Sequence, residues 1–267
     1  LAILQVTLLR PGQILWGKFL ASWIAGLAFL IVSLPFLVVA VALGGLSAAH
    51  ILVALVMLAV EVAVVCALGV GISALANRPL FSIVVTYLLV AVLTVGTLIV
   101  FGLGTALSVG DVQANSIYYK NSTVGPTDPY YEKPPADVTD QNDQYACYGP
   151  MQTQRYPHME RVAWILSMNP FVVVADAIPY PMKTADRSNP NGVFEVISQG
   201  ARSAQAGPAS VGQCIDGKVS PSYFGQTTPL WPLGLGLQLV LSALILLLGW
   251  RSLRTPAGKL AQGTRIA

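Results

Sequence analysis

The sequence predicts an all-α membrane protein with four transmembrane helices and a long extracytoplasmic insertion that carries an interfacial helix. Composition is the first observation: 54% of the 267 residues are hydrophobic and only 10% are charged, whereas about a quarter are charged in soluble globular chains. The mean hydropathy of +0.64 agrees with this. The apolar residues also gather into blocks of about 20 or more, the length that a helix needs to cross a bilayer. Much of the chain therefore has lipid as its solvent.

Four such blocks are predicted to cross the membrane. Backbone polar groups must be satisfied internally in lipid, so each block is predicted to be a helix rather than a strand. Pro35 and the pair Gly69 and Gly71 predict kinks or close helix contacts. The blocks run from Phe19 to Leu43, from Ile51 to Ala76, from Phe81 to Ala106 and from Leu230 to Trp250.

The stretch from residue 107 to residue 228 differs in composition from its flanks. It contains eleven of the twelve acidic residues, twelve of the eighteen prolines and nine of the ten tyrosines, which predicts a water-exposed region. Within it, Val162 to Ile178 is apolar but is interrupted by Asn169 and Pro170 and carries Asp176. This length and this break favour a helix that lies at the outer interface, or that dips in and returns, over a crossing helix.

Lys and Arg in the short flanks orient the chain, because such residues are retained on the cytoplasmic side. They lie before the first block, between the second and third, and after the last: Arg10, Lys18, Arg78, Arg251, Arg254, Lys259 and Arg265. Both ends of this chain are therefore predicted to be cytoplasmic, at the plasma membrane. The predicted regions are a cytoplasmic entry segment (1–18), three transmembrane helices (19–106), an extracytoplasmic region (107–228), the last transmembrane helix (229–250) and a basic cytoplasmic tail (251–267).

The cysteines agree with this orientation. Cys66 lies inside a block, whereas Cys147 and Cys214 both lie in the insertion. An oxidising environment there would allow these two to pair, so the sequence predicts a disulfide between them. The alternative is two unpaired thiols, which are less common in an exported region.

Glu61 is the only acidic residue inside a block. A charge at the bilayer centre costs about 2.5 to 3.5 kcal/mol on insertion scales, so its side chain is expected to face the bundle interior, a partner or a cavity. One interpretation is a group that contacts protons or substrate, and the other is a neutral or hydrogen-bonded glutamate that joins two helices. Small residues recur around it at four-residue spacing and predict a packing face, within one chain or between two copies: Ala59, Ala63, Ala67 and Gly71.

No pattern of catalytic or metal-binding residues emerges. Gly12 to Lys18 has the spacing of a phosphate-binding loop, but Phe19 follows where Ser or Thr would hold magnesium, and no strand precedes it. His50 and His158 lack companions at metal-ligand spacing. We therefore predict no catalytic residue, metal or cofactor, and no nucleic-acid partner, since no recognition motif accompanies the basic residues.

Two segments carry a family resemblance. The first joins Leu8, Leu9, Arg10 and Pro11 to Ile14-Leu15-Trp16-Gly17-Lys18, and it resembles the segment of type-2 ABC transporter permeases between a cytoplasmic coupling helix and the third span. The second is Asn169-Pro170-Phe171 followed by Asp176, which is similar to the Asn-Pro-Phe stretch on the outer side before the last span of that family.

The resemblance implies a permease subunit of an ATP-driven ABC exporter that hydrolyses nothing itself. Its partners would be a cytoplasmic ABC ATPase, docking through Leu8 to Pro11 with Gly17 and Lys18, and a second permease subunit, identical or different, in the lipid bilayer. The family usually has six spans, so the first two would be absent here.

Two other functions compete with transport. The four helices could anchor the insertion as an extracytoplasmic receptor or assembly protein, which the length of the insertion supports. An intramembrane enzyme that uses Glu61 is the second, and it lacks another polar catalytic partner in the blocks.

Overall fold

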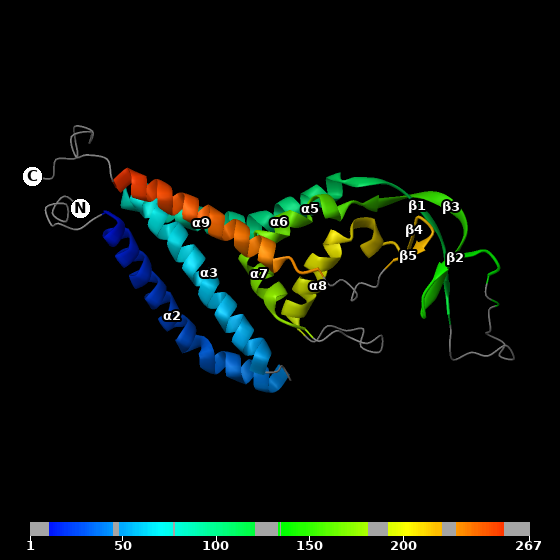
Figure 1. Cartoon of the computed structure of the whole chain (residues 1–267), viewed down its shortest axis with the longest axis horizontal. Coiled ribbons are helices and arrows are strands. Elements are labelled where there is room, and N and C mark those ends of the chain that lie inside the picture. Colours follow the sequence, from blue (N-terminus) through cyan, green and yellow to red (C-terminus); the bar gives the residue numbers. More distant parts are fainter. Residues whose placement is uncertain are drawn as a thin grey trace, which may run out of the picture. The chain divides into compact units, whose positions relative to one another are not determined.

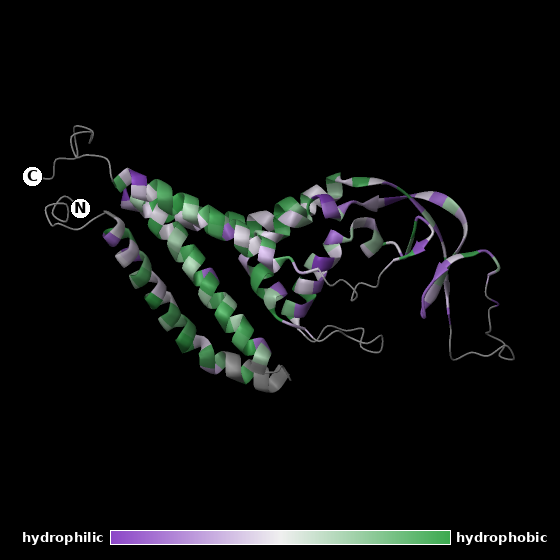
Figure 2. Ribbon diagram, viewed as in Figure 1, coloured by the Kyte–Doolittle hydropathy of each residue, from purple (hydrophilic) through white to green (hydrophobic). Residues whose placement is uncertain are grey.

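The computed structural model describes residues 11–44, 48–76, 78–120, 133, 135–180, 192–220 and 228–253. The chain divides into two compact units, which are Leu1–Gly96 with Pro232–Ala267, and Thr97–Trp231. Figure 1 shows the helices and strands of the two units. Figure 2 shows that hydrophobic residues dominate α2, α3 and α9, whereas the strands of the second unit carry more hydrophilic ones.

The first unit contains long apolar helices. They are α2 (Pro11–Gly44), α3 (Ala48–Leu75), α4 (Pro79–Ala91) with the π-helix η1 (Val92–Gly96), and α9 (Trp231–Leu253) from its second residue onward. Four segments are long and apolar enough to cross a membrane: Gly12–Phe36, Ala49–Leu75, Pro79–Leu107 and Trp231–Leu253. The four predicted spans are therefore confirmed as helices. The first begins at Pro11 rather than at Phe19, because the predicted entry segment continues the helix without a break.

Small residues let the helices of the first unit approach closely. The indole Nε1 of Trp23 in α2 donates a hydrogen bond to the carbonyl of Ala59 in α3 at 3.0 Å. Gly71 of α3 lies against Ile245 of α9, where an added Cβ would be 2.7 Å from the Ile245 Cγ2. Gly249 meets the same turn of α3, with the Gly71 carbonyl 3.0 Å from its ideal Cβ. Gly71 thus serves packing within this chain.

The second unit contains helices and a sheet. Its helices are α5 (Thr97–Leu107), α6 (Ala163–Ser167), α7 (Pro170–Ala177) and α8 (Val193–Gln205), with 3-10 turns η2 (Met159–Arg161) and η3 (Gly207–Ser210). Its strands are β1 (Val109–Tyr119), β2 (Val138–Gln141), β3 (Tyr145–Pro157), β4 (Cys214–Ile215) and β5 (Lys218–Val219).

The sheet contradicts the prediction of an all-α fold. Its order is β2-β3-β1-β4-β5 and every pairing is antiparallel, with Val109 opposite Pro157 and Tyr119 opposite Tyr145 along the long β1–β3 ribbon. The alternation of apolar and polar residues that signals a strand is missing from β3, because six consecutive residues of the thirteen, 150–155, are exposed whichever face they are on. What remained as a signal was the enrichment in Tyr and Thr, which favour strands only weakly by themselves.

Two small cores hold the second unit together. One joins α6, α7 and α8 to the start of α9 through buried apolar side chains: Ala163, Leu166, Val172, Ala201, Ala204 and Leu230. We call it the helical core, and Phe101 of α5 packs against it. The other lies in the sheet around the disulfide between Cys147 and Cys214, with Tyr145 buried beside it. The structure thus contains the disulfide expected from the sequence.

Candidate functional site

The segment from His158 to Asn169 runs back along α5 toward the start of that helix. At the end of α5, the backbone N–H of His158 donates to the Ser108 carbonyl at 3.1 Å, and the Ser108 hydroxyl donates to the His158 carbonyl at 3.2 Å. Val162 then lies against Gly104, whose ideal Cβ would be 2.9 Å from the Val162 Cγ1. At the far end, the Asn169 side chain reaches Thr97.

These contacts show how far the segment from His158 to Asn169 extends along α5. Thr97 is the first residue of α5 and Leu107 is the last, and ten residues of α-helix rise about 15 Å. Since α5 is the second half of the candidate span Pro79–Leu107, Asn169 lies about 15 Å inside that span. The contacts therefore favour the dipping arrangement that the sequence left open. The stretch 162–178 is not one helix but two, α6 and α7, which meet at Asn169.

Asn169 is placed by the start of α7. Its Oδ1 accepts a hydrogen bond from the backbone N–H of Phe171 at 2.9 Å, and Pro170 occupies the first helical position. An Asn cap followed by Pro is a strong helix start, because the cap satisfies a free amide and Pro supplies a suitable φ. Its Nδ2 donates to the Thr97 hydroxyl at 3.0 Å, and Asn169 is only 1% exposed. Thr97 directly follows η1, and π-helices are frequent at functional sites.

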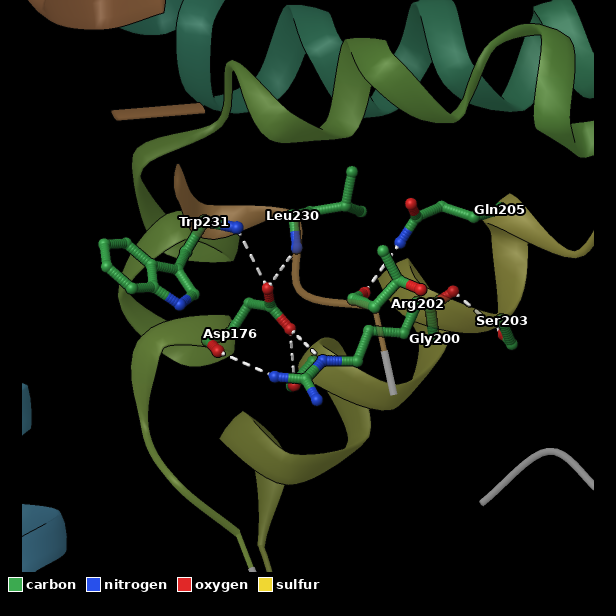
Figure 3. A network of polar contacts seen from close by, with 9 residues as sticks. Asp176, Gly200, Arg202, Ser203, Gln205, Leu230 and Trp231 are labelled. Carbon is green, nitrogen blue, oxygen red and sulfur yellow. Dashed lines mark hydrogen bonds and ion pairs between the residues drawn. The ribbon is translucent and has the colours of Figure 1, made fainter. Parts of the chain in front are cut away.

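Asp176, near the end of α7, is the centre of a buried polar network (Figure 3). Its Oδ1 accepts from the Arg202 Nε at 2.5 Å and from the Ser198 hydroxyl at 2.8 Å. Its Oδ2 accepts from the backbone N–H groups of Leu230 and Trp231 at 2.6 and 3.0 Å. One carboxylate thus binds α8 on one side and caps the first amides of α9 on the other. Its negative charge at a helix N-terminus is also favourable.

Besides the ion pair of Asp176 with Arg202, a second acidic residue and a tyrosine lie near this network. Glu195 of α8 is buried, and its Oε1 accepts a hydrogen bond from the Gln199 side chain at 3.2 Å. Burial raises the pKa of the Tyr180 hydroxyl above its ordinary value of 10.0, and the carboxylates of Glu195 and Asp176 raise it further, while Arg202 lowers it. Tyr180 is therefore neutral at physiological pH.

The other residues singled out in the sequence lie elsewhere. Gly17 and Lys18 are in the first turns of α2, with Lys18 exposed, and Pro11 begins that helix. Leu8, Leu9 and Arg10 lie outside the described residues.

Glu61 is buried at 6% exposure in α3. Among the residues that the structure describes, neither of its carboxyl oxygens has a hydrogen-bond partner. This disfavours the interpretation in which Glu61 joins two helices by a hydrogen bond.

Sequence reasoning identified Asn169 and Asp176 but missed their partners. Thr97 lies inside a span, and Ser198 and Arg202 lie more than twenty residues beyond Asp176. One signal existed, because Ser198 and Arg202 are four residues apart and so share a helix face. In the described part of the chain, no group of three His, Cys, Asp or Glu residues is placed to hold a metal ion.

Four helices long enough to cross a bilayer define a multi-pass membrane protein. A family model described as ABC-2 family transporter protein matches residues 10–250, so this chain belongs to the ABC-2 family of transporter permeases. Searches of curated proteins and of solved structures each found no match to the chain. The family assignment confirms the resemblance drawn from the sequence. It makes the chain a membrane component of a transporter rather than a catalytic subunit.

Proposed function

We propose that this protein is the permease subunit of an ATP-driven ABC exporter and moves a substrate across the plasma membrane with energy from a separate ATPase. The family match over residues 10–250 is the observation that supports the proposal most strongly. Members of this family normally work with an ATPase subunit and as dimers, so we infer a cytoplasmic ATPase and a second permease subunit as partners.

The positions of the basic residues in the first unit support the proposal that one end of its helices faces the cytoplasm. Gly12 of α2 approaches the indole of Trp250 in α9, and Ala74 of α3 meets Gly249. The start of α2, the end of α3 and the end of α9 therefore lie at the same end of this unit. Arg and Lys residues at that end are exposed: Lys18, Arg78 and Arg251. Because such residues stay on the cytoplasmic side, we infer that this end faces the ATPase.

The extracytoplasmic side of the membrane would then carry the sheet, together with α6 and α7. The disulfide between Cys147 and Cys214 supports that placement, because disulfides persist in oxidising compartments. Coupling would use residues 8–18: ATP binding by the partner shifts the permease between conformations through contacts that differ between them. Leu8, Leu9, Arg10, Pro11, Gly17 and Lys18 are the residues that we propose for this contact.

Site-specific photocrosslinking tests the coupling directly. A photoreactive residue is placed singly at positions 5 to 15 in cells that also express the ATPase that copurifies with this chain. The control position is Gln152 in β3, which is exposed and lies in the second unit. We expect crosslinks to the ATPase from the first set and none from the control. No crosslink from any position in the first set would overturn the proposed contact.

Copurification and vesicle assays test the function itself. The ATPase should copurify with this chain, and compounds that stimulate its hydrolysis identify the substrate. Transport into inverted vesicles establishes export. A chain that binds no ATPase but retains ligand through the 97–231 unit would instead support the receptor or assembly function, which the folded sheet favours.

A further inference from the structure

The first turn of α8 turns its apolar side chains outward and its polar ones inward. Val193, Phe194 and Val196 are 75%, 48% and 46% exposed. Glu195 and Ser198, between and after them, are only 3% and 1% exposed. A helix on the surface of a soluble protein has the opposite arrangement, with apolar residues facing the core.

The second half of α8 explains how this arrangement arises. Ala201 and Ala204 belong to the helical core, and Ile197 packs against it. At 100° per residue, these three share one face with Val193 and Val196. The apolar stripe of α8 therefore begins outside the helical core and enters it after the first turn. Meanwhile the polar face of α8 is fixed by the buried Asp176, which binds Ser198 and Arg202.

The neighbours of α8 expose large apolar side chains as well. Trp164 of α6 is 52% exposed and Phe171 of α7 is 60% exposed. Val162, which precedes α6, lies against Gly104 of α5, and Asn169, the N-cap of α7, donates to Thr97 at the start of α5. Since α5 is part of a candidate span, the medium around these exposed rings is the medium around the span itself.

We propose that the first turn of α8 lies in the lipid bilayer and that Val193, Phe194 and Val196 contact acyl chains there. Continuity supports lipid as the occupant: α8 shares the helical core with α6 and α7, and Phe101 of α5, which is part of a candidate span, packs against that core. A short amphipathic helix with Phe and Val on its free face and polar groups on the other is suited to the interfacial region. The inference requires only a bilayer, and it is independent of the ATPase, the substrate and the direction of transport.

Spin labelling of the whole chain in lipid nanodiscs tests this placement. In a Cys66→Ala background, Cys147 and Cys214 are joined, so an introduced cysteine is the single free thiol. Labels are placed singly through Phe194→Cys and Val196→Cys. Leu103→Cys in α5 is the lipid-facing reference, and Gln152→Cys in β3 is the water-facing one, because both positions are exposed.

The readout is the ratio of collision rates with oxygen, which concentrates in lipid, and with a water-soluble nickel complex. We expect ratios at 194 and 196 close to that at 103 and several-fold above that at 152. A ratio like that at 152 would place α8 in water and overturn the proposal. Low accessibility to both reagents would show a protein partner in place of lipid and would overturn it equally. Each labelled variant is measured only if it is monodisperse and retains its disulfide, and the two positions are independent.

Discussion

Replacing Asp176 by Ala should destabilise the Thr97–Trp231 unit strongly. The substitution removes four hydrogen bonds to a carboxylate that is 1% exposed. The Arg202 Nε and the backbone amides of Leu230 and Trp231 lose their acceptor, while the Arg202 Nη2 keeps its bond to the backbone carbonyl of residue 176. Breaking a buried ion pair costs about 3 to 5 kcal/mol. Because the Arg202 side chain is 23% exposed and water can replace part of its interaction, we expect about 3 kcal/mol, which corresponds to roughly 6 to 12 °C in Tm.

Two measurements check this expectation. Thermal unfolding of the purified protein in detergent gives the shift in Tm, and hydrogen exchange reports on the amides of Leu230 and Trp231. Asp111→Asn is the matched control: its ion pair with Arg155 is exposed and spans 3.7 Å, so it should change Tm by no more than about 2 °C. If Asp176→Ala melts like the control, and protection at the start of α9 is unchanged, the network does not hold that helix end.

Three further perturbations follow from the structure. Gly71→Ala should lower stability by about 1 to 3 kcal/mol, since the new Cβ meets the Ile245 side chain and backbone. Gly69→Ala, with only an ordinary contact 3.5 Å away, is its control, and equal Tm values would refute the clash. Glu61→Leu should raise stability by about 2 kcal/mol, because it removes a buried carboxyl that has no hydrogen-bond partner in the described part of the chain; a lower Tm would reveal a partner. Burial, followed by the charges of neighbouring groups, raises the pKa of Tyr145, so its stabilising effect is complete below its ordinary value of 10.0 and is lost as pH rises through the folded pKa. Tyr145→Phe should therefore flatten the alkaline fall in Tm that begins near pH 10.0 and continues above it, and an equally steep fall would contradict this.

The transmembrane part of the fold could be predicted because it depends on local composition. A block of about 20 apolar residues has few alternatives to a helix in lipid, and all four blocks are helical in the structure. The disulfide was also predictable, since Cys147 and Cys214 are the only cysteines in the polar insertion.

The sheet and the polar network could not be predicted, because both depend on pairings between distant residues. β1 and β3 are joined across the stretch 120–144, and β4 joins β1 from the far side of three helices. The Asn169 and Asp176 positions were recognised by resemblance, but the bonds that explain them come from Thr97, Ser198 and Arg202. The sequence spacing places Ser198 and Arg202 on one helix face, but no pattern in the sequence pairs them with Asp176 or pairs Thr97 with Asn169.

The paired hydrogen bonds between Ser108 and His158 have a consequence for chain length. Strand β1 begins just after α5, and β3 ends just before η2. Ser108 and His158, 50 positions apart in the sequence, are hydrogen-bonded to each other where the ribbon begins and ends. Insertions or deletions between β1 and β3 would leave Val162 held against Gly104 of α5. Size variation among homologous permeases is therefore expected to concentrate there, without disturbing α6.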